Sequence, residues 1–183
     1  MKILSLLALM LVSAPTFAAP ELPVKEVSHG LYVHLGKHLL PDSKNHGEIA
    51  NIGFIVGEKC VAVIDSGGSP EQGAALKQAV LKVTKTPICY VINTHVHPDH
   101  IYGNRAFKAA GVKFVGHHKL ARAMATRGSY YLDKADEQLG IKLTAADLIP
   151  PDIEVKDGLK LDLGGRFLTL TAYPTAHTDN DLS

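Results

Sequence analysis

One short segment, residues 95–100, constrains this chain more than any other. It reads His-Val-His-Pro-Asp-His, so three imidazoles and one carboxylate lie within six residues. Side chains two residues apart in an extended backbone point to the same side, which lets His95 and His97 approach one metal ion. Asp99 and His100 follow the next turn and can serve a neighbouring position. Zinc binds imidazole nitrogen and carboxylate oxygen readily, and the segment therefore predicts a metal site.

The segment comes at the end of an apolar stretch. Residues 88–92 read Ile-Cys-Tyr-Val-Ile and lead directly into the polar pair Asn93-Thr94. Clusters of histidine also occur as solvated loops that collect metal by chance. The position favours a functional role, because binding residues gather where buried strands end.

A metal held by two imidazoles alone would be weakly bound, so we expect a third ligand elsewhere. His177 is the best candidate, since it lies in a small polar turn directly after a second apolar stretch. This repeats the setting of the first histidines, which also follow a strand. The predicted metal ligands are thus His95, His97, Asp99, His100 and His177.

Hydrophobic patterns and turn residues predict alternating strands and helices. Strands are expected at residues 30–35, 51–56, 60–64, 88–92, 112–115, 155–163 and 166–173. Helices are expected at residues 69–83, 119–127 and 130–140, with a helical turn at 105–110. The strand, helix and strand over residues 60–92 form a crossover, which makes the two strands parallel. Asp65 and His95 are therefore expected at the same edge of the sheet.

The first residues resemble an export signal. Lys2 precedes an apolar run at residues 3–12, and small residues follow up to Ala19. The alternative, a membrane anchor, needs about 20 apolar residues, and this run is about half as long. We predict a signal peptide at residues 1–19, a periplasmic or secreted protein, and one domain at residues 24–183.

Composition narrows the class of partner. The formal net charge is +1, which indicates neither nucleic acid nor an anionic membrane surface as a partner. The chain has 183 residues and is 46% hydrophobic, which suits a single domain with a buried core. Composition thus points to neither of these partners.

Two cysteines, Cys60 and Cys89, lie in apolar strand-like stretches away from the histidines. Neither is expected to be a zinc ligand. A disulfide between them is compatible with an oxidising compartment. The interpretation that we prefer from sequence is that both are small unpaired core residues.

Several motifs together resemble the metallo-β-lactamase superfamily. They are the His-x-His-x-Asp-His run, an earlier Asp-x-Gly-like turn at residues 65–67, and a later Ala-His-Thr at residues 176–178. The resemblance extends from Val24 to Ser183. It implies an α/β fold, the metallo-β-lactamase αββα sandwich, of which this chain would supply mainly the N-terminal half.

Longer stretches of the sequence are similar to one branch of that superfamily, the quinoprotein relay system metallohydrolases. The similar stretches are residues 45–54, residues 97–100 with Gly103-Asn104, and residues 174–178. Members of this branch are exported proteins found beside quinone-dependent dehydrogenases. The resemblance therefore implies a periplasmic quinoprotein dehydrogenase system as a partner.

The superfamily resemblance also implies roles for individual residues. The three histidines at positions 95, 97 and 177 would hold one Zn²⁺, and Asp99 with His100 would hold part of a second site. A hydroxide shared between the metals would be the nucleophile, since zinc lowers the pKa of bound water to about 7. Asp99 would orient this hydroxide and manage its proton. Asp65 would bond to the ligands and to loop backbone.

In this family the second half of the sandwich supplies a bridging aspartate and one more histidine. The sequence ends at Ser183, six residues after His177. The resemblance thus implies one full zinc site and an incomplete second site. We expect the chain to be a fragment of a longer protein, and the activity of the chain itself stays open.

The function that the resemblance favours is an exported zinc-dependent hydrolase. Its nucleophile would attack an ester, thioester or amide carbonyl, and the small-molecule substrate that we expect as a partner follows from this resemblance. A β-lactamase proper has the same ligands and stays open. Two further alternatives are a mononuclear iron enzyme that oxidises sulfur compounds, and a non-catalytic metal-binding accessory or inactive fragment.

For other side chains, the sequence gives weaker indications of a functional role. His46 lies in a loop that overhangs the metal site in this superfamily, and a substrate-facing role is one alternative. The histidine pair at 117–118 is expected to have a capping or surface role. The tyrosine pair at 130–131 would open a flap or anchor its segment to the core. Arg127 is expected on a solvated helical face.

Overall fold

The computed structural model describes residues 22–183, so the predicted signal peptide at residues 1–19 lies outside the described part. Within residues 22–183, seven strands form one sheet, and their order in the sheet is their order in the chain. They are Lys25–Ser28 (β1), Leu31–His34 (β2), Ile52–Val56 (β3), Val61–Ile64 (β4), Ile88–Ile92 (β5), Lys113–His117 (β6) and Ile153–Val155 (β7). A separate hairpin contains Gly158–Asp162 (β8) and Phe167–Thr171 (β9).

The sheet changes from antiparallel to parallel along its width. Strands β1 to β4 pair antiparallel, whereas β4 to β7 pair in parallel. The helices are Pro70–Val83 (α1), Pro98–Ile101 (α2) and Leu120–Lys134 (α3), with short turns at Asn104–Phe107 (η1), Ala135–Leu139 (η2) and Ala145–Asp147 (η3). The predicted crossover is confirmed, since β4 and β5 pair in parallel on either side of α1. The carboxyl ends of the parallel strands share one edge, where residues 95–100 begin.

Helix α1 begins where local chemistry predicts. The Ser69 side chain accepts a hydrogen bond from a backbone N–H of the first turn at 3.1 Å, and Pro70 takes the first helical position. The inward face buries Leu76 and Val80 in a cluster that includes Phe54 of the sheet. Full burial of an aliphatic side chain contributes roughly 1.5–3 kcal/mol relative to exposure, so packing holds α1 on the sheet.

Helix α3 is longer than the sequence predicts. A break was expected at residues 128–129, but the helix continues through them and widens into η2. The Leu148 side chain packs closely against the helix at Gly128, where a Cβ would lie 3.1 Å from it. A glycine therefore suits this position although it is a weak helix former. Gly140 then ends η2 with a left-handed φ of 67°. Among the described residues, no helix is long and apolar enough to cross a membrane.

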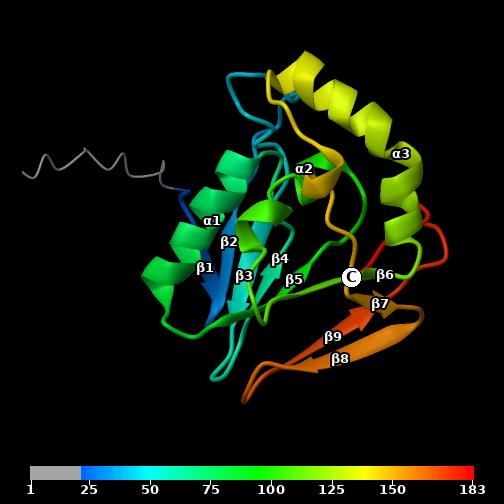
Figure 1. The fold of residues 1–183 in the computed structure, drawn as a ribbon. Coiled ribbons are helices and arrows are strands. Elements are labelled where there is room, and N and C mark those ends of the chain that lie inside the picture. The colour runs from blue at the N-terminus through cyan, green and yellow to red at the C-terminus, as the bar shows by residue number, and fades with distance from the viewer. Residues whose placement is uncertain (1–21) are drawn as a thin grey trace, which may run out of the picture.

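The molecule is layered. Figure 1 shows the helices on one side of the sheet and the hairpin of β8 and β9 on the other. The hairpin packs on the sheet through Leu161, Leu163 and Leu170, which join a core cluster with Ile92 and Val115. The sequence predicted one strand over residues 155–163, but the chain leaves the large sheet after β7 and crosses to the other layer as β8. This layering of helices, large sheet and second sheet confirms the predicted α/β sandwich fold.

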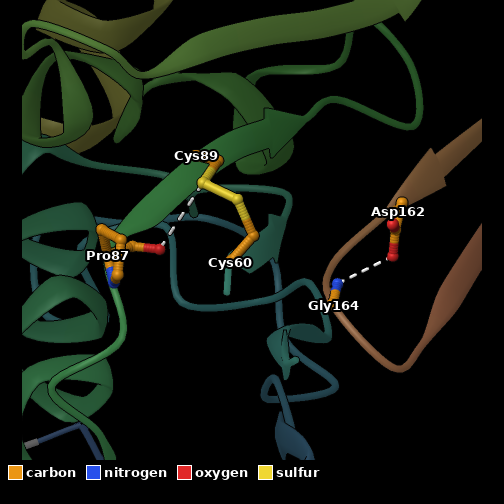
Figure 2. Close-up of a disulfide and its surroundings, with 5 residues drawn as sticks. All are labelled: Cys60, Pro87, Cys89, Asp162 and Gly164. Carbon is orange, nitrogen blue, oxygen red and sulfur yellow. Dashed lines mark hydrogen bonds between the residues drawn. A yellow bond between two sulfur atoms is a disulfide. The ribbon is translucent and has the colours of Figure 1, made fainter. Parts of the chain in front are cut away.

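The cysteine prediction is wrong: Cys60 and Cys89 form a disulfide (Figure 2). Cys60 lies directly before β4 and Cys89 near the start of β5, and these strands pair in parallel with Val61 opposite Ile88. The register brings the two Cα atoms to 5.6 Å, which is the usual span of a disulfide. The bridge lies at the opposite end of the strands from the histidine segment. Figure 2 also shows the neighbouring hairpin turn, where the Gly164 N–H donates to Asp162 at 2.8 Å.

Candidate metal centre

Three imidazoles meet beyond the carboxyl ends of the strands. His95 and His97 follow β5, and His177 lies in the loop after β9. The Nδ1 atom of His97 lies 3.1 Å from Nε2 of His95 and 3.0 Å from Nε2 of His177. One ring nitrogen of each residue lies within 4.8 Å of the other two. The structure thus brings the expected third histidine to the expected pair.

A chain of hydrogen bonds orients the His95 ring. Its Nδ1 lies 2.9 Å from Oγ1 of Thr94, and the Thr94 hydroxyl donates to Oδ2 of Asp65 at 2.8 Å. Because a carboxylate only accepts, the hydroxyl proton belongs to that bond, and Nδ1 of His95 must carry the proton of the other. Nε2 therefore keeps a lone pair that faces the other two rings. A metal ligand requires this tautomer.

Burial keeps the His95 and His97 rings uncharged. Burial first, and then the charge of nearby His100, lowers the pKa of His95 to about 4. Burial also lowers the pKa of His97, with a further contribution from His177. Metals bind neutral imidazole, so these two rings are in the binding form at neutral pH.

Asp99 and His100 lie beside the cluster, at the start of α2. Nδ1 of His100 donates to Oδ2 of Asp65 at 2.7 Å, and its Nε2 lies 3.3 Å from Oδ2 of Asp99. Burial opposes the charge of His100, but hydrogen bonds to Asp65 and Asp99 outweigh it and raise the pKa to about 10. Burial also raises the pKa of Asp99, but the hydrogen bond with His100 outweighs it and the net shift is downward. The pair would offer one nitrogen and one carboxylate to a second cation, which has to displace the Nε2 proton of His100.

Buried polar groups hold the backbone of α2. Asn93 and Asn104 exchange side-chain hydrogen bonds of 3.1 and 2.8 Å. Asn93 also donates to the carbonyl of His100 at 3.3 Å, and the backbone N–H of Ser66 donates to the same oxygen at 2.9 Å. Asn93, Asn104 and Ser66 are all buried, where an unpaired polar group would cost about 1–3 kcal/mol. The loop of the site is therefore tied to the ends of β4 and β5.

Two contacts hold the loop that carries His177. Asp181 accepts from the backbone N–H and from the hydroxyl of Thr178, both at 2.7 Å. Arg127 of α3 lies 3.5 Å from Asp179, and its side chain stays 41% exposed, so it reaches this loop from the solvated helical face on which it was expected. The sequence reasoning did not foresee this contact, nor the role of Asp181. The Thr-x-x-Asp spacing, which is typical of a turn closed by side-chain bonds, is the signal that indicates Asp181.

The other candidate residues lie outside the histidine cluster. His46 lines a separate cavity at the start of α1. His117 is buried, and its Nε2 lies 3.0 Å from the carbonyl of Tyr173 while its Nδ1 accepts from the backbone of Lys119. This is the capping role that was expected. The tyrosine pair at 130–131 lies on α3 itself and not on a separate flap.

The donor set fits zinc. With Zn–N bonds of 2.0–2.1 Å, two nitrogens of a tetrahedral site lie about 3.4 Å apart. The two short separations among the imidazole nitrogens, 3.1 and 3.0 Å, are close to that value. A cation bound among these nitrogens would be held by their lone pairs and would replace any proton shared between the rings. The residues present therefore suit a three-histidine zinc site.

Solved structures of two known proteins have the same fold as this chain. A metallo-β-lactamase from Hirschia baltica has a TM-score of 0.63 and 20% identity, over 89% of this chain and 65% of its own. A stereoselective inverting sec-alkylsulfatase from a Pseudomonas species has a TM-score of 0.64 and 20% identity, over 87% of this chain and 28% of its own. At these identities the similarity shows the fold.

A sequence relative is also an alkylsulfatase. A linear primary-alkylsulfatase from a Pseudomonas species is 32% identical over 73 residues, which make up 37% of this chain and 14% of that one. The chain therefore spans less than two thirds of the length of each of these three proteins. The family model of the metallo-beta-lactamase superfamily matches residues 47–183, a range that contains every predicted metal ligand. With that match, and with the sandwich layers and the histidine cluster at the strand ends, the chain belongs to the metallo-β-lactamase superfamily.

Proposed function

We propose that this chain binds zinc through His95, His97 and His177 and hydrolyses an ester, thioester or amide carbonyl. The observation that carries the proposal is the convergence of one nitrogen from each histidine beside the carboxylate of Asp99. When bound, zinc supplies Lewis acidity and lowers the pKa of bound water to about 7, so that a nucleophile is available at neutral pH.

The side chains of the protein contribute position and proton transfer. Asp99, whose side chain is 25% exposed, accepts a hydrogen bond from the attacking water and takes up its proton at a carboxylate oxygen. Asp65 and Thr94 keep His95 in the tautomer that leaves Nε2 free. His100, held through Nδ1 by Asp65, presents Nε2 with Asp99 as the partial second site.

Elemental analysis of the purified protein tests the metal assignment. We expect about one zinc per chain, lost in His177→Ala, because a structural or catalytic zinc needs three protein ligands or more. His29→Ala is the control, since the His29 side chain is 99% exposed. Bound iron would favour the sulfur-oxidising alternative. Equal zinc in wild type and His177→Ala would overturn the ligand set.

Substrate panels separate the reactions that share these ligands. An aryl ester and a thioester test the proposed carbonyl chemistry, and nitrocefin tests the β-lactamase alternative. An alkyl sulfate is the second candidate substrate, which the segment 32% identical to a linear primary-alkylsulfatase favours. Turnover should disappear in His95→Ala. A zinc-loaded protein without turnover of any of these would favour the non-catalytic accessory.

The periplasm is the location that we propose. The charged, apolar and small-residue pattern of residues 1–19 supports export, and the disulfide between Cys60 and Cys89 supports an oxidising compartment. A quinoprotein dehydrogenase system is the proposed neighbour there. Fractionation of cells that express the full chain, with the cysteines titrated in each fraction, tests the location.

A further inference from the structure

A cavity of about 240 Å³ opens beside the metal centre. One wall is the buried face of α3 and η2, with Tyr131, Ala135 and Leu139. Pro98 and Asp99 of the metal-centre segment also line the cavity. Because Asp99 belongs both to this cavity and to the candidate metal centre, a molecule held in the cavity can extend directly to the reacting groups.

The opposing wall is a loop, residues 41–49, that lies close to the end of β4. Its position depends on a close approach of Gly47 to Gly68: a Cβ on Gly47 would lie 2.7 Å from the Gly68 carbonyl oxygen. Gly47 also has a φ of 72°, which favours glycine. This contact places Pro41 and Ile49 in the cavity wall opposite α3.

Two polar groups that line the cavity, the Tyr102 hydroxyl and the Lys134 ammonium, are already paired. The Tyr102 hydroxyl donates to the backbone carbonyl of Tyr131 at 2.6 Å, so its ring, not its hydroxyl, is available. The ammonium of Lys134 lies 2.5 Å from a Glu137 carboxylate oxygen and 5.7 Å from the Tyr130 ring centre. An anionic group in the cavity would compete with Glu137 and be repelled by Asp99.

Building on the proposed function, we propose that this cavity binds an uncharged apolar arm of the substrate, with the bond to be cleaved at Asp99. The volume is below that of cavities for drug-sized ligands, so one aromatic ring or a short alkyl chain is the expected arm. Tyr130, at the rim and 60% exposed, closes over the arm.

Titration of the purified protein with 1-alkanols, from ethanol to octanol, tests the cavity without any need for turnover. The Kd should fall about fourfold for each buried methylene until the cavity is full. Tyr130→Ala should weaken hexanol binding about fivefold through loss of the aromatic wall. Phe167→Ala is a matched control, because Phe167 is also 60% exposed but lies on the hairpin strand β9.

The same preference should appear in turnover of 4-nitrophenyl esters. The ratio of kcat/KM for hexanoate to that for acetate should exceed tenfold and should drop in Tyr130→Ala. Alkanol binding that does not depend on chain length overturns the cavity proposal, as does equal weakening in Phe167→Ala. Hexanoate ion binding more tightly than hexanol overturns the uncharged arm.

The two proposals fail separately. Ester hydrolysis with no chain-length preference would overturn the cavity proposal and leave the proposed function in place. Alkanol binding that strengthens with chain length, without hydrolysis of any ester, thioester or amide by the zinc-loaded protein, would support the cavity and overturn the proposed function.

Discussion

At the scale of single residues, the site depends on where a few protons lie. The Asp65 carboxylate accepts three hydrogen bonds, from the backbone and hydroxyl of Thr94 and from Nδ1 of His100. The backbone of Asp65 has a φ of 56°, a left-handed conformation that aspartate tolerates better than most residues. One buried carboxylate thus holds the Nδ1 proton of His100 directly and that of His95 through Thr94.

Substitution of Thr94 tests this relay. Thr94→Val keeps the shape of the side chain but removes the hydroxyl that accepts from His95. Loss of a partner behind a ligand lowers metal affinity about 10–100-fold, and we expect a loss in this range. Zinc competition against a chromophoric chelator measures it. Thr126→Val is the control, because the Thr126 hydroxyl bonds only to a helix carbonyl in the described structure; equal affinity in both variants would contradict the relay.

Sequence reasoning identified the histidines, and the family resemblance implied that Asp65 bonds to ligands and to loop backbone. The link from Asp65 through Thr94 to His95 was not foreseen. His95, His97 and His177 each follow an apolar strand, and this local signal is readable from sequence. The hydrogen bonds of Asp65 to Thr94 span 29 residues and depend on the register of β4 and β5, which no local pattern specifies. The disulfide between Cys60 and Cys89 depends on the same register, and for this reason the prediction about it was wrong.

At the scale of elements, short-range rules predicted the parallel crossover and missed the path of α3. The Ser69 cap and Pro70 marked the start of α1 correctly. The expected break near Gly128 did not occur, because tertiary packing against Leu148 overrides a weak helix propensity. The continuous helix has a consequence for the site, since it carries Arg127 to the His177 loop and forms one wall of the cavity.

The turn η3 after α3 provides a pH-dependent contribution to stability. Burial raises the pKa of Asp147, but hydrogen bonds from the Thr144 backbone and hydroxyl and from Arg105 outweigh it, so the pKa is lowered. The carboxylate therefore stabilises the fold above its unfolded pKa of about 4, and this stability is lost as the pH falls through the folded pKa.

Asp147→Asn should lower the free energy of unfolding at pH 7 by about 1 kcal/mol, the usual value of a cap. The difference from wild type should shrink at pH 3, where the wild-type carboxylate loses its advantage. Urea unfolding at both pH values measures this. Asp133→Asn on the exposed side of α3 is the control. A loss of the same size at both pH values would contradict the assignment.

At the scale of the molecule, the two ends of the parallel strands have different tasks. The carboxyl ends carry the histidine cluster, and the amino ends of β4 and β5 are joined by the disulfide. The layers themselves were predicted, because the superfamily motifs imply a sandwich. The assignment of residues 158–162 to the second sheet was not, since strand pattern alone does not say to which layer a strand belongs.

Because the two ends of the strands lie apart, we expect loss of the disulfide to lower stability without changing zinc binding. The disulfide joins cysteines 29 residues apart, and the double variant Cys60→Ser with Cys89→Ser should lose about 3 kcal/mol of unfolding free energy. Zinc content should not change, because the bridge lies at the far end of the strands. Urea unfolding with parallel elemental analysis checks both. A variant that loses its zinc while still folded would show that the two ends are coupled.

The central claim is that three imidazole nitrogens from residues 95, 97 and 177 hold a zinc ion. X-ray absorption at the zinc edge of the purified protein tests it most directly. We predict three nitrogen ligands of imidazole type at about 2.0–2.1 Å and no sulfur ligand. His177→Ala should lose one of these imidazoles or the metal itself. A thiolate shell, or a spectrum that His177→Ala leaves unchanged, would contradict the account.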